Sequence, residues 1–194
     1  MSINLADIKR IREETGAGMM DVKSALTDAN GDITKAKELL QQRGIAKASK
    51  KSDRNTDQGL IETYNHLGKV GVLLELNCET DFVARTDDFK ALAKEIAMQI
   101  AASDPQYLSD QDIDKQTLAE WKSEVSDQVD TTKPQEIQDK IIEGKLDKYR
   151  DELVLMRIKT LKDPDKSISD LIKANIAKLG ENITIKRFVR YQLG

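Results

Sequence analysis

Hydrophobic residues recur every three or four positions at the start of the chain, and this spacing predicts three short helices within residues 1–44. Asn4 is placed to cap the first helix and Gly16 to end it, while Asp32 is placed to cap the third, which we expect to end at Gly44. The residues predicted to face inward are Leu5, Ile8, Ile11, Ile33, Ala36, Leu39 and Leu40. Helices of this length form a bundle with a small core, which favours docking over an enclosed active site.

The pattern changes at residues 45–58, which are small, polar and locally basic. We interpret this segment as a linker and domain boundary between the bundle and a core domain of residues 59–194. A solvated tether is the favoured role. The alternative is contact with RNA through the basic run from Lys47 to Arg54.

The core domain begins and ends with sequences typical of strands. Leu60–Asn65 and Val70–Cys78 are predicted to form a hairpin with glycine at its turn, and Val72–Leu76 is apolar enough for an inner strand. Ile183–Leu193 is a third strand-like segment at the end of the chain. Together these segments predict a three-stranded antiparallel sheet.

Between the second and third strands the sequence is helical. A turn or short helix is expected at Thr80–Arg85, an amphipathic helix at Asp87–Ala102, and a helical hairpin at about residues 111–156. Thr132–Gln135 and Ser167–Asp170 each fit a capping box, which predicts that a helix begins there. The residues predicted to be buried are Phe89, Leu92, Ala93, Ile96 and Ile100 in the long helix, and Leu118, Trp121, Val125, Val129, Ile137, Ile141, Leu146, Tyr149 and Leu153 in the hairpin. The predicted fold class is α+β.

The composition is typical of a helix-rich protein, and its near-neutral net charge does not point to a strongly charged partner. Aromatic residues make up 4% of the chain and charged residues 34%, while the net charge is only −3. No general attraction to nucleic acid or to an anionic membrane follows from this balance. The start of the chain lacks the pattern of a signal peptide, no apolar run is long enough to cross a bilayer, and there is one cysteine. We therefore expect a soluble, cytoplasmic protein with no disulfide and no membrane partner.

Residues that could support bond chemistry are few. His66 is the only histidine and falls at the predicted hairpin turn, and Cys78 is expected to be a strand residue rather than a nucleophile. The chain has no cluster of Cys and His for zinc and no glycine-rich phosphate loop. We therefore predict that the protein is not an enzyme, has no cofactor and binds no nucleotide directly.

Two stretches depart from the surrounding pattern and are candidates for binding. In Thr15–Lys23, two glycines lie beside Met19 and Met20, and methionine is common on surfaces that adapt to a partner. The alternative is that one of these methionines fills the bundle core. In Asn77–Arg85, Phe82 lies among charged residues just after a strand, where binding residues are often found. The alternative is that Phe82 anchors the following helix to the sheet.

These two stretches resemble the two signature motifs of elongation factor Ts. Thr15-Gly16-Ala17-Gly18-Met19-Met20-Asp21 with Lys23 resembles the first motif, and Asn77-Cys78-Glu79-Thr80-Asp81-Phe82-Val83-Ala84 resembles the second. Further similarities lie at Gly59-Leu60-Ile61 to His66, Ile96 to Ala102, Gly180-Glu181-Asn182-Ile183 and Arg187 to Tyr191. The similarity extends over nearly the whole chain in the order of the family.

The resemblance implies a guanine-nucleotide exchange factor for the translational GTPase elongation factor Tu, with a UBA-like N-terminal bundle. The loop Thr80-Asp81-Phe82-Val83 would insert between helices of the GTPase, disturb its magnesium and phosphate sites and so release GDP. A second contact would come from the bundle through Arg12, Met19, Met20 and Lys23. The partner would be bound both with GDP and without nucleotide.

The sequence also departs from the family. Val22 stands where cysteine is usual, and Met156–Lys159 lies where many members carry Gln-Pro-Phe, which removes support for contacts near that segment. Longer members have a doubled core, so we expect this shorter chain to form a homodimer. An RNA- or ribosome-associated binding protein that uses the basic linker is the alternative function.

Overall fold

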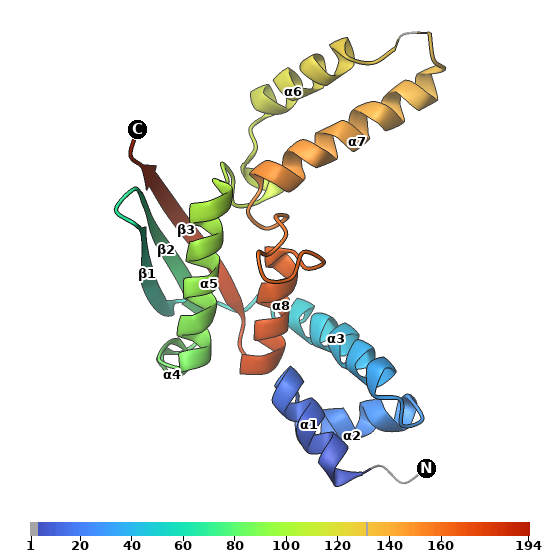
Figure 1. Ribbon diagram of the computed structural model, residues 1–194, viewed down its shortest axis with the longest axis vertical. Coiled ribbons are helices and arrows are strands. Elements are labelled where there is room, and N and C mark those ends of the chain that lie inside the picture. Colours follow the sequence, from blue (N-terminus) through green and yellow to red (C-terminus); the bar gives the residue numbers. More distant parts are fainter. Residues whose placement is uncertain (1–3, 131) are drawn as a thin grey trace.

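The computed structural model describes residues 4–130 and 132–194 and confirms the α+β class (Figure 1). Residues 1–3, which form part of the segment examined for a signal peptide, lie outside the described residues. In chain order the elements are α1 Leu5–Thr15, α2 Met19–Asp28, α3 Ile33–Ser49, β1 Gln58–His66, β2 Val70–Cys78, α4 Asp81–Ala84, α5 Asp87–Ser103, the 3-10 turn η1 Asp110–Asp112, α6 Lys115–Asp127, α7 Gln135–Leu153, α8 Ile168–Leu179 and β3 Ile183–Gln192.

The sheet is antiparallel with the order β1-β2-β3, as predicted, so β2 is the inner strand. Its apolar sequence suits this position because an inner strand is paired on both edges. Leu67 and Gly68 both have positive φ in the turn that joins β1 and β2. Gly68 adopts this conformation at little cost, which allows the tight hairpin.

One face of the sheet is covered by helices and the other is not (Figure 1). α5 packs on β1 and β2, and α8 packs on α5 and β3. The residues of α5 that were predicted to be buried all lie in this core, together with Leu74 and Leu76 of β2. Ser167 and Asp170 form the predicted capping box at the start of α8, and Gly180 ends that helix with φ of 80°. This framework fixes the position of α4, which follows β2 directly.

The N-terminal helices form a bundle with a hydrophobic core of its own, which contains Ile8, Ile11, Val22 and Leu26. The Asn4 side chain caps α1 as predicted, by accepting a hydrogen bond from the amide of Ala6. The prediction that Leu5 faces the core is wrong, since its side chain is exposed. Leu5 is the first residue of α1, where no neighbouring helix covers it.

The third helix is longer than predicted, because α3 continues through Gly44 and ends at Ser49. Gly44 lies against α8: a Cβ atom added there would be 3.1 Å from Cβ of Ala177. Glycine is therefore used here for close helix packing and not to end the helix. The first part of the predicted linker is thus helical and lies against the core domain.

The second part of the predicted linker is not a solvated tether. Asn182 donates its side-chain amide to the carbonyl oxygens of Ser52 and Arg54. The carbonyl of Thr56 accepts a hydrogen bond from the Asn77 side chain at 3.1 Å, and Lys51 donates to the carbonyl of Gly180. Sequence composition could not show these contacts, because the partners are far apart in the chain. Asn77 lies 21 residues from Thr56, and Gly180 lies 129 residues from Lys51. The segment is a structured connection, and the division of the chain into domains remains a prediction.

The predicted helical hairpin is present as α6 and α7, which project from the core as an arm (Figure 1). Trp121 makes edge-to-face contacts with Tyr107 and Tyr149, and these three rings support the base of the arm. Two details of the prediction are wrong. Ile137 is exposed, and α7 begins after Pro134 without a side-chain cap, because Thr132 bonds to Asp130 instead.

Candidate functional site

The Thr80–Val83 loop presents one aromatic side chain to solvent. The Thr80 hydroxyl caps α4 by accepting a hydrogen bond from the amide of Val83 at 3.4 Å. Phe82 is 81% exposed, whereas Ala84 is buried against the sheet. The alternative in which Phe82 anchors the helix is therefore wrong, because a core anchor would be buried. An exposed phenylalanine at a capped turn is available to a partner.

Two carboxylates hold this turn in place, and sequence reasoning did not single them out. The Glu181 carboxylate accepts hydrogen bonds from the amide of Thr80 at 2.9 Å and from its hydroxyl at 2.6 Å. In the other direction, the Glu79 carboxylate accepts one from the amide of Asn182 at 2.6 Å. The β2–α4 loop and the α8–β3 loop therefore brace each other. The only signal in the sequence was that both segments lie in stretches that resemble the family.

The remaining polar groups of the loop do not form a catalytic site. Asp81 makes an ion pair with Arg85 at 2.8 Å, and both side chains are largely exposed. Cys78 is buried, and its thiol donates a hydrogen bond to the carbonyl of Thr80 at 3.1 Å. Burial, with the nearby Glu181 charge, raises the pKa of this thiol. A buried thiol with a raised pKa stays protonated at neutral pH and is a poor nucleophile.

The residues predicted to make the bundle contact are all on its surface. Met20 is 74% exposed and Met19 is 45% exposed, while Arg12 and Lys23 are also exposed. The alternative in which one methionine fills the bundle core is wrong. Val22 occupies that position, because it lies on the opposite face of α2 from Met20 and is fully buried. Two adjacent exposed methionines form an adaptable apolar surface.

Both candidate surfaces lie at the same end of the molecule, opposite the α6–α7 arm (Figure 1). Lys178 of α8 links the regions that carry them. Its aliphatic chain lies over Gly16 in the first motif, where an added Cβ atom would approach Lys178 Cγ to 2.6 Å. Its ammonium group pairs with Asp88 near the start of α5 at 2.7 Å. The packing therefore connects the first motif through α8 to the start of α5, which follows the second motif in the chain.

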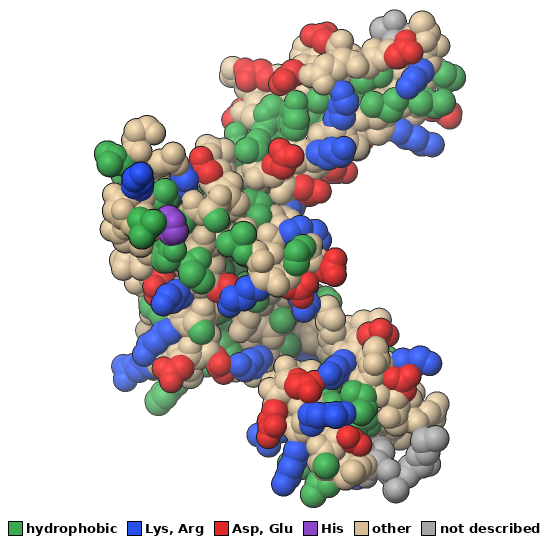
Figure 2. Space-filling view, viewed as in Figure 1, with side chains coloured by type: hydrophobic (Ala, Val, Ile, Leu, Met, Phe, Trp, Pro, Cys, Tyr) green, Lys and Arg blue, Asp and Glu red, His purple; other side chains and the backbone are tan. Residues whose placement is uncertain are grey.

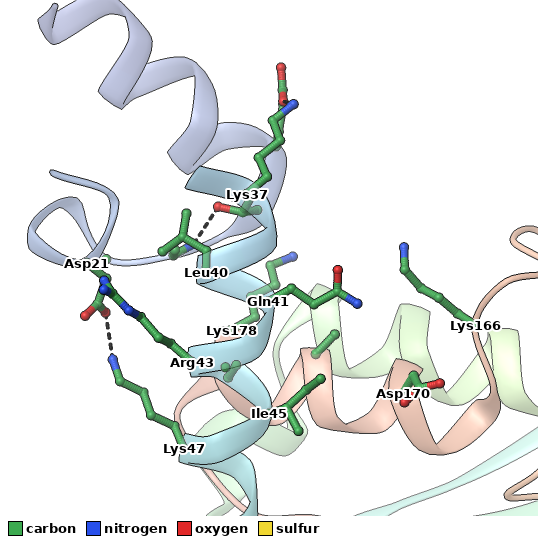
Figure 3. A pocket seen from close by; sticks show the side chains of 17 residues that line it. Asp21, Lys37, Leu40, Gln41, Arg43, Ile45, Lys47, Lys166, Asp170 and Lys178 are labelled. Atoms are coloured by element: carbon green, nitrogen blue, oxygen red, sulfur yellow. Dashed lines mark hydrogen bonds and ion pairs between the residues drawn. The ribbon is translucent and has the colours of Figure 1, made fainter. Parts of the chain in front are cut away.

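A cleft of about 410 Å³ lies between the bundle and α8, beside the contact of α3 with α8 (Figure 3). Cationic side chains surround it, but each is paired: Lys47 with Asp21 at 2.8 Å, Lys166 with Asp163 at 2.7 Å, and Lys37 with Glu14. The ion pair with Lys37 holds the pKa of Glu14 below its usual value. These ion pairs offset the positive charge along the cleft.

The basic run that could have contacted RNA is largely engaged within the protein. Lys47 pairs with Asp21, Lys51 bonds to the carbonyl of Gly180, and Arg54 lies 3.4 Å from the Glu79 carboxylate. His66 is exposed at the end of β1 and accepts or donates a hydrogen bond to the Tyr64 hydroxyl at 3.1 Å. Among residues 4–130 and 132–194, no three His, Cys, Asp or Glu side chains are grouped to hold a metal ion. Within the same residues, every helix is too short or too polar to span a membrane.

Comparisons with known proteins agree on one family over the full length. The sequence profile of the family described as "Elongation factor TS" matches residues 2–194. The chain is 48% identical over 194 residues to elongation factor Ts of Thermodesulfovibrio yellowstonii, covering 100% of this chain and 98% of that protein. It is 50% identical over 196 residues to elongation factor Ts of Fervidobacterium nodosum, with 100% of both chains covered. The protein of that name from a Thermoanaerobacter species is 47% identical, over 99% of this chain and 95% of the relative.

Proposed function

The chain belongs to the elongation factor Ts family of translation elongation factors, and on this premise we propose that it is a guanine-nucleotide exchange factor for elongation factor Tu. The observation that carries the proposal is Phe82, which is exposed on a turn that is braced against the core. In this role the protein forms and breaks no covalent bond. It acts in the cytoplasm, where translation takes place, and binds its partner both with GDP and without nucleotide.

The mechanism is mechanical displacement followed by loss of electrostatic compensation. Phe82 inserts between helices of the nucleotide-binding domain, while Thr80, Asp81 and Val83 form the surface around it. Displaced helices no longer hold the magnesium ion and the phosphate contacts in place. The negative charge of GDP then lacks its partners, so the nucleotide leaves faster.

Thermodynamic linkage makes this action reversible. If the factor weakens nucleotide binding by a given factor, nucleotide weakens binding of the factor by the same amount. GTP binding to the partner therefore expels the factor and completes the cycle. The chain needs no nucleotide site of its own for this, since all coupling passes through the partner.

The bundle supplies a second contact that holds the partner while the turn acts on it. Met19 and Met20 offer apolar surface, and Arg12 and Lys23 lie exposed on the same bundle to pair with acidic groups. Contacts of this kind contribute affinity and orientation more than displacement.

We further propose that two copies of the chain pair through the uncovered face of the sheet. Apolar side chains from all three strands are exposed there, and Leu73 and Val189 are direct cross-strand neighbours. The exposed hydrophobic residues of the sheet are Ile61, Leu73, Val189 and Tyr191. A twofold axis would bury the same patch on both copies. Light scattering should show a dimer that Leu73→Lys converts to monomer; a monomeric wild type at micromolar concentration would contradict this.

The exchange mechanism is tested by releasing a fluorescent GDP analogue from purified elongation factor Tu. Phe82→Ala should remove about 2 kcal/mol or more of interface energy, which corresponds to a loss of about 30-fold in stimulated release. Asp81→Ala should lose less, since its charge is partly neutralised by Arg85. A well-folded Phe82→Ala protein with wild-type exchange would defeat the proposed role of the loop.

A further inference from the structure

The braces at the N-terminal end of α4 tie together three segments that are distant in the sequence. The Glu181 carboxylate accepts hydrogen bonds from the backbone amide and the hydroxyl of Thr80, and the Glu79 carboxylate accepts one from the backbone amide of Asn182. Asn182 is buried, and its side chain reaches the carbonyls of Ser52 and Arg54 just after α3. We refer to Glu79, Thr80, Glu181 and Asn182 as the clasp.

Glu79 and Thr80 of the clasp lie just before Phe82 in the chain, and the clasp is built from hydrogen bonds to carboxylates. Hydrogen bonds that involve a carboxylate are shorter and stronger than those between neutral groups. Here, three of them join two loops, with donor–acceptor distances of 2.9, 2.6 and 2.6 Å. The helix α4 has only four residues, of which Ala84 is buried in the core and Val83 is partly buried against it. The clasp adds charge-assisted hydrogen bonds to this short stretch of apolar packing.

Rigidity has a specific consequence for a side chain that must displace its partner's helices. If the turn that carries Phe82 deforms when the partner binds, part of the binding free energy is spent on deforming the turn. Less of it is then available to displace the helices of the partner. Binding energy accelerates a step only when it is realised at that step, and small misplacements of an acting group are costly. A loose turn can thus still bind while it fails to release nucleotide.

We propose that Glu181 is a positioning residue for nucleotide exchange: through the clasp, it keeps Phe82 rigid enough to convert binding into displacement. This inference rests on the proposed exchange function. It assigns to Glu181 a role that depends on Thr80 and not on contact with the partner. The clasp also joins the turn to the segment that follows α3, through the side chain of Asn182.

The test compares maximal exchange rate with affinity for full-length variants. Glu181→Gln keeps the size of the side chain but removes the charge, and its amide can offer only one oxygen to two donors. Thr80→Val keeps the shape of Thr80 and removes its hydroxyl. Glu95→Gln is the matched control, because Glu95 makes an ion pair of 2.7 Å with Lys162 elsewhere on α5. For each protein, release of a fluorescent GDP analogue is titrated to saturation, and affinity for nucleotide-free elongation factor Tu and the melting temperature are measured.

The expected result for Glu181→Gln is a maximal rate lower by about tenfold. Its affinity for the nucleotide-free partner should change by less than about threefold, and Glu95→Gln should behave as wild type. The double variant Thr80→Val/Glu181→Gln should lose little more than the worse single variant, because both act through one interaction. The inference is overturned if rate and affinity fall together in step with the melting temperature, or if the maximal rate is unchanged.

Failure of this inference can be told apart from failure of the exchange function. If the wild-type chain does not accelerate release at all, the proposed exchange function is wrong. If Phe82→Ala is fully active, exchange occurs without the proposed role of the loop. If Phe82→Ala is inactive while Glu181→Gln reaches the wild-type maximal rate, only the role of the clasp is wrong. Should Glu181→Gln fail to fold, Glu79→Gln removes the opposite half of the clasp. The same split between rate and affinity is then required of that variant.

Discussion

The α4 turn and the N-terminal bundle both present exposed hydrophobic side chains, but on different supports. Phe82 stands on a four-residue helix whose N-terminal end is tied to the α8–β3 loop by charged hydrogen bonds. Met19 and Met20 stand on the first turn of α2, in a bundle with its own small core. The bundle meets the core domain mainly where α3 packs against α8, beside an open cleft. Figure 2 shows the bundle and the α6–α7 arm as separate projections on either side of a concave face.

This difference suggests that the two surfaces have different roles, one in displacing part of the partner and one in binding it. A rigid aromatic group on a braced support is suited to displacing part of a partner. Flexible methionines on a less firmly attached unit are suited to holding a surface that changes shape. Variants of the α4 turn should therefore change the rate of exchange, and variants of the bundle should change affinity.

The largest effect separates two phenylalanines that lie seven residues apart. Phe89 is fully buried beneath the sheet, so Phe89→Ala should lower the free energy of unfolding by about 3–5 kcal/mol. Phe82→Ala should leave that free energy within about 0.5 kcal/mol of wild type, because the side chain is exposed. Denaturant unfolding of both variants measures the contrast. Equal destabilisation by the two variants would mean that Phe82 is a core residue.

The next largest effect concerns the bundle core. Leu26 is almost fully buried there, and Leu26→Ala should destabilise the bundle by about 2–5 kcal/mol. If the bundle folds as a separate unit, calorimetry should show its transition at lower temperature while the transition of the core is unchanged. A single transition that shifts as a whole would show that bundle and core unfold together. The packing of α3 on α8 makes this a stringent test of the predicted domain division.

A smaller effect is expected on the methionine surface. Met20→Ala should weaken binding to nucleotide-free elongation factor Tu by about 1 kcal/mol, or about fivefold, while the maximal exchange rate stays at the wild-type value. Leu67→Ala is a suitable control, because Leu67 is as exposed as Met20 but lies at the far hairpin turn. A reduced maximal rate for Met20→Ala with unchanged affinity would contradict the proposal that the bundle contributes affinity and the α4 turn contributes displacement.

The smallest effect involves α8, against which both regions are held. The Ser167 hydroxyl donates a hydrogen bond to Asp170, and this bond lowers the pKa of that carboxyl. A carboxyl whose pKa is lowered on folding stabilises the protein above its unfolded pKa, and the contribution is lost as pH falls through the folded pKa. Asp170→Asn should therefore cost about 1 kcal/mol at pH 7 and little at pH 2. Unfolding free energies at the two pH values measure this; an equal cost at both would contradict it.

Local sequence was sufficient to place most of the helices and strands and to locate the two candidate motifs. The α5 core residues, the Ser167–Asp170 cap and the β1–β2 turn were all predictable because each depends on residues within a few positions of one another. The position of Phe82 after a strand was also readable. The sequence did not show whether the Phe82 side chain faces the core or the solvent, because that depends on how Ala84 packs against the sheet.

The most consequential predictions that failed involve contacts between residues far apart in the chain. Gly44 was expected to end a helix, but its role is set by Ala177 of α8. The polar composition of residues 45–58 suggested a tether, yet Asn182 and Asn77 hold this segment against the core. Glu181 was one acidic residue among many until the structure placed it beside Thr80. The composition of a segment does not show which distant residues it contacts in the folded protein.

If Phe82 drives exchange, a small amount of this chain should release GDP from many molecules of elongation factor Tu. The decisive measurement mixes elongation factor Tu carrying a fluorescent GDP analogue with excess unlabelled GDP and about one tenth of an equivalent of the chain. We expect complete release at a rate proportional to the concentration of the chain, because each molecule acts repeatedly. Phe82→Ala at the same concentration should release nucleotide about 30-fold more slowly. Release at the spontaneous rate with the wild-type chain, or equal acceleration by Phe82→Ala, would show that Phe82 does not drive exchange.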